Sequence, residues 1–153
     1  MASSGKSSSP VHLFDLPPST TANLVQSADT FLFDLDGVIW AGQDLLPGVK
    51  EFLGMLKAQR KQGLNMLCPK LNATDAVLKD TIAAFFVSNN SMKSRDTYVK
   101  RFKELGLESP PKDHIYNSAY AAAAYLHENE FKGKAYVMGG RGITDELTEL
   151  GEN

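Results

Sequence analysis

Short apolar runs alternate with helix-like patterns along most of this chain. The first run, at residues 30–33, ends in Asp34, and a second, at residues 85–87, ends in Ser88. Runs this short and this apolar are typical of strands buried on both faces, as in a parallel sheet. We expect a third strand at residues 135–138.

Between these runs, apolar residues recur at helical spacing. One predicted helix starts after Pro47 and Gly48 and stops at Gly63, and another carries Tyr98 on its apolar face and stops at Gly106. Proline near a helix start and glycine beyond its end fit the usual capping preferences. Further helices are predicted at residues 19–25, 72–82, 118–127 and 143–150. Strands and helices in this order predict an α/β fold with a mostly parallel sheet.

Length and composition limit the classes of protein to consider. The 153 residues suit one domain, and the 42% apolar and 22% charged residues are close to the globular average. No stretch has the roughly 20 apolar residues that a membrane span needs. The net charge of −2 argues against a nucleic-acid partner. The single cysteine, Cys68, excludes an internal disulfide and a cysteine-based zinc site.

The N-terminus is rich in serine and lacks an apolar segment. We therefore expect residues 1–27 to form a flexible tail and residues 28–153 to form the folded unit. The tail does not resemble a secretory signal, and it has too little arginine for a typical transit peptide. A cytoplasmic location is the default expectation, with organelle targeting left open.

Two carboxylates, Asp34 and Asp36, follow the first apolar run and stand two residues apart. In an extended chain their side chains point to the same side, and such like charges are costly without a cation or a shared proton. Ligands of open α/β sheets bind at the carboxyl ends of the strands. The pair therefore predicts a Mg²⁺ site there, because Mg²⁺ prefers oxygen ligands. Gly37 allows a sharp turn beside this site.

A second polar cluster, Ser88, Asn89, Asn90 and Ser91, follows the next apolar run. Hydroxyl and amide groups between a strand end and a helix start are able to hydrogen-bond a phosphate. The two clusters together predict a site for a phosphorylated ligand and a divalent cation.

These motifs, in this order, resemble the haloacid dehalogenase superfamily, and more narrowly its phosphoglycolate phosphatase and 4-nitrophenylphosphatase group. The resemblance covers most of residues 28–151 and implies a partial Rossmann-like core. It is carried by Asp34-x-Asp36-Gly-Val-Ile-Trp40, Leu-Pro47-Gly-Val, Phe-Val-Ser88-Asn-Asn-Ser91 and Lys93-Ser-Arg95, and by the stretches at residues 117–126 and 136–143.

The resemblance also implies roles for individual residues. Asp34 is the expected nucleophile, which forms an aspartyl-phosphate, and Asp36 is the expected general acid and base. Ser88, Asn89 and Asn90 are expected to bind the phosphoryl oxygens. Mg²⁺ is expected at the Asp34 carboxylate and the Asp36 backbone carbonyl. The implied substrate is a small phosphorylated metabolite, 2-phosphoglycolate, which is hydrolysed to glycolate and phosphate.

The sequence departs from the family pattern in two ways. The family's core needs a later lysine and a later Gly-Asp motif beyond a substrate-selecting cap domain, and the dipeptide Gly-Asp does not occur here. We therefore expect a truncated core without the cap, and no homodimer, since the family can associate through the cap. About residues 64–83 also form an apparent insertion, in which residues 64–67 look like the start of a strand. A retained intron or alternative exon would explain both departures, whereas a tolerated surface loop would explain the insertion.

Two further hypotheses follow from these departures. One is a non-catalytic product of the same gene, in which Leu32, Phe86 and Val137 lack part of their cover in an incomplete sheet. The other is a phosphoacceptor signalling domain, which is also α/β with aspartates at a strand end.

Overall fold

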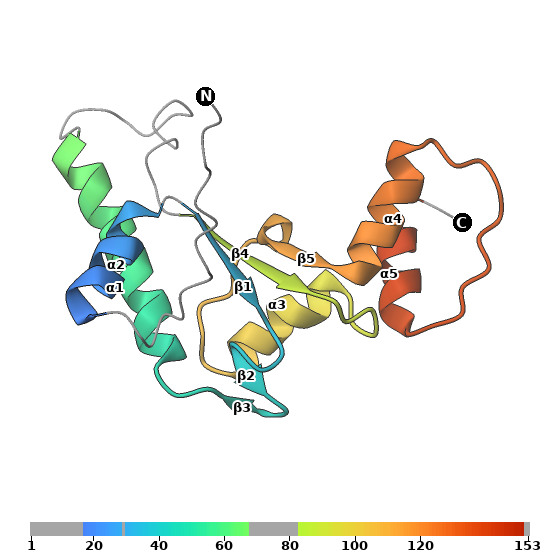
Figure 1. Ribbon diagram of the computed structural model, residues 1–153. Helices are drawn as coiled ribbons and strands as arrows, with labels where there is room; N and C mark the ends of the chain where they lie inside the picture. The colour runs from blue at the N-terminus through green and yellow to red at the C-terminus, as the bar shows by residue number, and fades with distance from the viewer. Residues whose placement is uncertain (1–16, 29, 68–82, 152–153) are drawn as a thin grey trace, which may run out of the picture.

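The structure is a computed structural model and describes residues 17–28, 30–67 and 83–151. Its elements alternate between strands and helices along the chain (Figure 1). The helices are α1 (Pro18–Ser27), α2 (Val49–Leu67), α3 (Arg95–Glu104), α4 (Ser118–Glu128), α5 (Arg141–Glu149) and the short 3₁₀ helix η3 (Lys112–His114). The strands are β1 (Thr30–Asp34), β2 (Trp40–Ala41), β3 (Asp44–Leu45), β4 (Ala83–Ser88) and β5 (Ile115–Asn117). The expected α/β class is confirmed.

The main sheet has the strand order β1-β4-β5, and both pairs are parallel. The register pairs Asp34 with Val87, and Ser88 with Asn117. The carboxyl ends of the three strands therefore meet at one edge of the sheet. The small antiparallel hairpin of β2 and β3 follows directly after β1.

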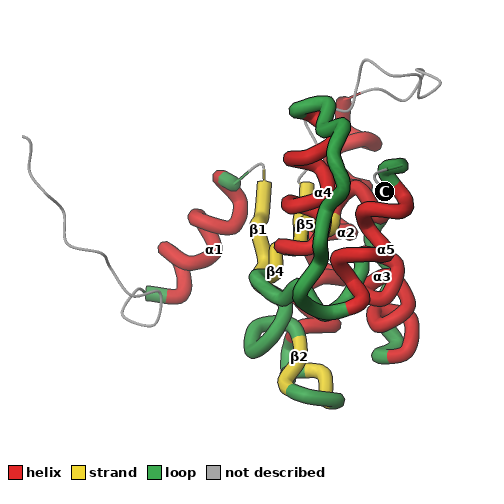
Figure 2. Tube along the Cα trace, turned by 90° about the vertical axis from the view of Figure 1, so that its right-hand side faces the viewer, coloured by secondary structure: helices red, strands yellow, loops and turns green. Residues whose placement is uncertain are grey.

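Aromatic side chains form the core on one face of this sheet. Phe33 and Phe86 stack at 5.6 Å, with Phe52 of α2 edge-on to Phe33 at 6.1 Å and Phe102 of α3 edge-on to Phe86 at 4.7 Å. Helices α2 and α3 thus cover the same face of the sheet. Figure 2 shows α1 on the other side of β1, away from the remaining helices. This helix confirms the one expected at residues 19–25. The expectation of a flexible tail over residues 1–27 is therefore wrong for Pro18–Ser27, which is helical, while residues 1–16 lie outside the described residues.

Glycine ends α3 as expected. Gly106 has φ of +70°, and the backbone N–H groups of Gly106 and Leu107 donate to the carbonyls of Lys103 and Phe102. This pair of bonds is a Schellman motif, which needs a left-handed residue after the helix. The expected stop of α2 at Gly63 is wrong, because α2 continues to Leu67 and also includes the residues interpreted as a strand start. An internal glycine costs a helix only about 1 kcal/mol relative to alanine.

The third strand lies elsewhere than predicted. Residues 135–138 form no strand, whereas Ile115–Asn117 pairs with β4. An apolar run becomes a strand only where a neighbouring strand offers free backbone groups, and β5 already occupies this edge of β4. Tyr136, in the predicted strand, is 90% exposed. The helices predicted at residues 118–127 and 143–150 are confirmed as α4 and α5.

The expected exposure of the sheet is confirmed in part. Leu32, on the β1 edge, is 71% exposed, as predicted. Phe86 is only 3% exposed, so that prediction is wrong, because Phe102 of α3 covers it. Val137 is half-buried in a loop. The predicted helix at residues 72–82, Cys68 and most of the apparent insertion lie outside the described residues. No helix among those described is long and apolar enough to cross a membrane.

Candidate functional site

Asp34 and Asp36 lie at the carboxyl end of β1, and both are exposed. After Asp36 the chain reverses at Gly37, whose φ is +89°. The Gly37 N–H donates to the Trp40 carbonyl at 2.7 Å, which closes the turn. Only glycine adopts this left-handed conformation without strain, so the sequence-based interpretation of Gly37 is confirmed.

Ser88 lies beside the two aspartates at the end of the neighbouring strand. Because Asp34 pairs with Val87, Ser88 is the next residue along β4. Ser88 is only 4% exposed, and its Oγ accepts the backbone N–H of Asn90 at 3.1 Å. The Asn90 side-chain oxygen accepts the N–H of Met92 at 2.8 Å, so Asn90 also shapes the loop. Asn89 is exposed.

Two buried aromatic residues, Trp40 and Tyr98, connect Asp36 to Ser88. The Trp40 indole N–H donates to Asp36 Oδ1 at 2.9 Å, and the Trp40 ring stacks on Tyr98 at 6.1 Å. The Tyr98 hydroxyl lies 3.3 Å from Ser88 Oγ. From the sequence, Trp40 was predicted only as part of a motif and Tyr98 only as a core residue. The contacts of Tyr98 with Ser88 and Trp40 join separate elements, so no local pattern predicts them, whereas the Trp40–Asp36 contact spans only four residues.

The electrostatics of Tyr98 reflect this neighbourhood. Burial raises the pKa of the Tyr98 hydroxyl above its ordinary value, and the hydrogen bond with Ser88 opposes the rise. The negative charges of Asp36 and Asp34 also raise this pKa. The negative charges of both carboxylates therefore act on the ionisation of the Tyr98 hydroxyl. The Lys93 ammonium lies 5.9 Å from the Tyr98 ring centre, which places a positive charge nearby.

The loop that follows Ser88 is anchored by three later residues. Asn117 donates to the Lys93 carbonyl at 2.6 Å while its Oδ1 accepts the Tyr120 N–H and so caps α4. Ser118 donates to the Asn89 carbonyl at 2.9 Å. The backbone N–H of Gly142 donates to the Met92 carbonyl at 3.2 Å. These bonds place the polar groups of the loop from outside the loop itself.

Gly140 and Gly142 are required for close approach to this loop. A Cβ at Gly140 would lie 2.5 Å from Met92 Cα, and one at Gly142 would lie 2.5 Å from the Lys93 carbonyl carbon. Side chains at either position would push α5 away from the loop. The glycines at positions 140 and 142 therefore allow close packing against the loop after Ser88.

A buried ion pair holds α5 against α3. Glu146 is fully buried and accepts hydrogen bonds from the backbone N–H of Arg95 and from Arg95 Nε, the latter at 2.8 Å. The Arg95 guanidinium also lies 3.5 Å above the Tyr120 ring. Arg95 begins α3 immediately after the loop, so this pair fixes where the loop ends.

The residues at the strand ends fit a Mg²⁺ ion. Among the described residues, neither Asp34 nor Asp36 forms an ion pair, and the Asp36 backbone carbonyl accepts no backbone hydrogen bond. A carboxylate and a free carbonyl are hard oxygen donors of the kind that Mg²⁺ combines with waters and substrate phosphates. The described part of the chain has no cluster of three or more acidic, histidine or cysteine side chains that would form a closed metal cage.

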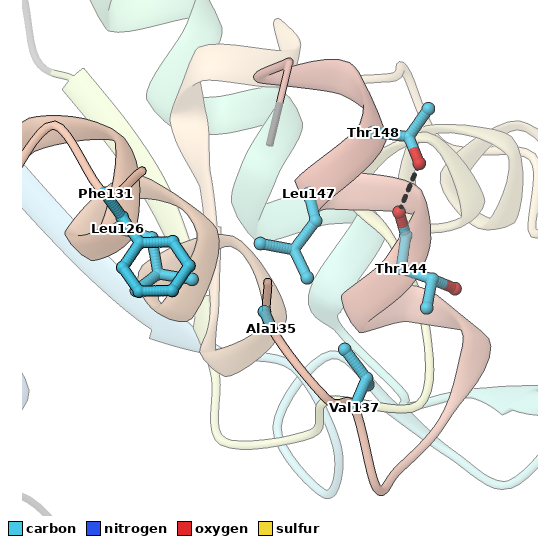
Figure 3. Close-up of a pocket in the computed structure, with 7 residues that line it drawn as sticks. All are labelled: Leu126, Phe131, Ala135, Val137, Thr144, Leu147 and Thr148. Carbon is cyan, nitrogen blue, oxygen red and sulfur yellow. Dashed lines mark hydrogen bonds between the residues drawn. The ribbon is translucent and has the colours of Figure 1, made fainter. Parts of the chain in front are cut away.

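A separate hollow of about 180 Å³ lies between α4, α5 and the loop that joins them (Figure 3). It has no charged lining residue and includes none of the predicted site residues; it is lined by Leu126, Phe131, Ala135, Val137, Thr144, Leu147 and Thr148. A phosphate ester finds no cationic partner there. The predicted site residues lie instead at the strand ends, outside this hollow.

Comparison with known proteins agrees with this geometry. The family model of haloacid dehalogenase-like hydrolases matches residues 31–153. Phosphoglycolate phosphatase 2 of Arabidopsis thaliana is 40% identical over 138 residues, which are 89% of this chain and 39% of that protein. The 4-nitrophenylphosphatase of Schizosaccharomyces pombe is 34% identical over 88% of this chain and 39% of its own length.

A solved structure, the p-nitrophenyl phosphatase from Archaeoglobus fulgidus, has a TM-score of 0.62 and 26% identity over 82% of this chain and 40% of that one. The chain therefore spans about 40% of the length of the proteins it matches. The matched part includes both carboxylates, the loop after Ser88 and α5. On the family match and the identity to these relatives, the chain belongs to the haloacid dehalogenase-like hydrolases.

Proposed function

We propose that this chain carries the nucleophile and the phosphate-binding loop of a Mg²⁺-dependent phosphomonoester hydrolase of the phosphoglycolate phosphatase type. The observation that carries the proposal is the meeting of two exposed carboxylates at the end of β1 with the hydroxyl and amide groups that follow β4. The relatives described above are named as phosphatases of small phosphate esters, which supports the reaction class.

The reaction proceeds by two displacements at phosphorus. The Asp34 carboxylate attacks the phosphoryl group, the bond to the substrate alkoxide breaks, and an aspartyl-phosphate forms. Asp36 donates its proton to the leaving alkoxide. Water then attacks the aspartyl-phosphate and gives a proton to Asp36. This hydrolysis releases phosphate and restores the Asp34 carboxylate. With 2-phosphoglycolate the products are glycolate and phosphate.

The loop after Ser88 binds the phosphoryl oxygens. Ser88, Asn89 and Asn90 supply hydroxyl and amide donors, and the nearby Lys93 ammonium contributes positive charge. The Asp34 carboxylate and the Asp36 backbone carbonyl would hold Mg²⁺, which when bound would neutralise charge on the transferring group. Phosphoryl transfer depends mainly on such positioning and electrostatic stabilisation.

Hydrolysis of p-nitrophenyl phosphate by the purified chain, with and without Mg²⁺, tests the proposal. Mg²⁺-dependent turnover that is lost in Asp34→Asn and kept in the matched control Asp113→Asn, at an exposed residue of η3, would support hydrolysis by this chain and would mean that the later lysine and Gly-Asp motif are not essential. Folded protein without turnover above the Asp34→Asn level would refute hydrolysis by this chain and favour the non-catalytic alternative. Phosphate retained on Asp34 after incubation with a phosphorylated partner kinase, without ester hydrolysis, would favour the phosphoacceptor alternative.

A further inference from the structure

The acid at the end of β1 and the hydroxyl at the end of β4 share one buried support. Trp40 is 1% exposed and Tyr98 is fully buried, and their rings are stacked within 19° of parallel. Trp40 is bonded to Asp36 at its indole N–H, and Tyr98 reaches Ser88 with its hydroxyl. Polar contacts of this kind, made by otherwise apolar core residues, orient the groups that they touch.

The hydrogen bonds of Ser88 limit which way its proton points. Ser88 Oγ already accepts the N–H of Asn90. A hydroxyl has one proton to donate and two acceptor positions. The Ser88–Tyr98 hydrogen bond is able to run in either direction, and with the neutral Tyr98 hydroxyl as donor it fills the second acceptor position of Ser88. Ser88 is then left with only its own proton to give. Phosphate oxygens accept hydrogen bonds, so this arrangement suits a phosphate beside Ser88.

Asp36 is constrained in a complementary way. The indole N–H occupies one carboxylate oxygen, Oδ1, at 2.9 Å. Trp40 itself is fixed by Tyr98 on one ring face and by Phe102, which packs edge-on at 5.3 Å. The rigid indole therefore holds the carboxylate in one rotamer and leaves the other oxygen for proton transfer.

We propose that Trp40 and Tyr98 are positioning residues, in which Trp40 holds the Asp36 carboxylate and Tyr98 directs the Ser88 proton toward the substrate phosphate. The inference rests on the proposed function for the roles of Asp36 and Ser88. The two contacts themselves are testable without turnover, because Trp40 is the only tryptophan in the sequence.

Nuclear magnetic resonance of the full chain tests the contacts. The single indole N–H resonance is expected to move in Asp36→Ala and to stay in place in the matched control Asp113→Ala. The ring-carbon resonance next to the Tyr98 hydroxyl is expected to move in Ser88→Ala. An indole resonance unchanged by Asp36→Ala, or a Tyr98 resonance unchanged by Ser88→Ala, would overturn the inference.

Kinetics on p-nitrophenyl phosphate then separate positioning from general packing. Trp40→Phe, which keeps a ring but loses the N–H, is expected to lower kcat by about tenfold with little change in KM. Tyr98→Phe is expected to raise KM, and the inhibition constant of inorganic phosphate, by about tenfold. Two variants are the controls. Tyr125→Phe changes a 66% exposed tyrosine, and Phe102→Leu loosens the packing against Trp40 but keeps the indole N–H.

Equal effects of Trp40→Phe and Phe102→Leu on both constants would overturn the inference, since that pattern reflects packing. If the unsubstituted chain shows no turnover, the proposed hydrolysis fails, and the resonances alone decide the inference. Resonances that move as expected would then still show that Trp40 contacts Asp36 and that Tyr98 contacts Ser88.

Discussion

Replacing Glu146 by leucine tests how strongly α5 is held against the start of α3, directly after the loop that follows Ser88. Leucine has a volume close to that of glutamate, so the substitution removes the carboxylate with little cavity. It leaves the Arg95 guanidinium and the Arg95 backbone N–H without their main acceptor. The Arg95 side chain is only 8% exposed, so water does not replace the lost partner well.

The expected loss follows from these contacts. Removing one partner of a buried ion pair typically costs about 3–5 kcal/mol, because the other charge stays buried. Glu149, which lies 3.6 Å from the Arg95 guanidinium and is partly exposed, retains part of the interaction. We therefore expect about 3 kcal/mol, a large part of the roughly 5–15 kcal/mol that stabilises an ordinary domain.

Urea unfolding of the variant and the unsubstituted chain measures this difference, provided that both unfold with the same denaturant slope. The double variant Arg95→Met/Glu146→Leu is expected to recover most of the loss, but not the cost of the Arg95 backbone N–H. Arg141→Met, in an exposed pair with Asp145, is the control and is expected to change little. A loss below about 1 kcal/mol for Glu146→Leu, or no recovery in the double variant, would refute the reasoning.

Three further predictions concern the stability of the folded chain. Gly142→Ala is expected to cost about 1–3 kcal/mol of stability through overpacking. Gly54→Ala, in α2 with open space around it, is expected to stabilise the chain by about 0.5–1 kcal/mol. Thermal melts are expected to show a lower melting temperature for the first variant and a higher one for the second. Asn117→Ala is expected to lower stability by about 1–2 kcal/mol through loss of the α4 cap, and unchanged stability in urea would contradict this. Stability is expected to fall as pH rises above about 10, because the pKa values of Tyr98 and Lys112 are raised in the folded chain, so the unfolded chain loses these protons first. A pH series of melts checks this, and a fall that is no shallower in Tyr98→Phe would exclude the tyrosine as a contributor.

The structure of this chain was predictable where the deciding contacts are local. Helix α3 ends through bonds that Gly106 and Leu107 donate to carbonyls three and five positions earlier, respectively, and Gly37 closes its turn with Trp40 three positions later. Such signals are read from a short stretch of sequence. The parallel pairing of β1 and β4 was also predictable, because the two apolar runs are separated by a helix and leave no short hairpin as an alternative.

One error, the position of the third strand, arises where two segments suit the same partner strand. Residues 135–138 have as apolar a pattern as residues 115–117, yet only the latter pair with β4. Sequence pattern measures whether a segment suits a strand, but it does not measure which segment reaches the free edge first along the chain. The shorter path from α3 favours β5 at this edge, since closing a shorter loop costs less entropy.

The same limit applies to the candidate site, and it has a consequence for function. That Asp34, Asp36 and Ser88 lie together was predictable, because all three stand at or just after the ends of neighbouring strands. Other contacts around the site join distant positions: Ser88 meets Tyr98 ten positions later, and Arg95, at the end of the loop after Ser88, meets Glu146 fifty-one positions later. The loop that follows Ser88 has no regular backbone pairing of its own, so its geometry depends on α3, α4 and α5. Substitutions in α5 are therefore expected to weaken phosphate binding without touching a phosphate, through the same contacts that stabilise the fold.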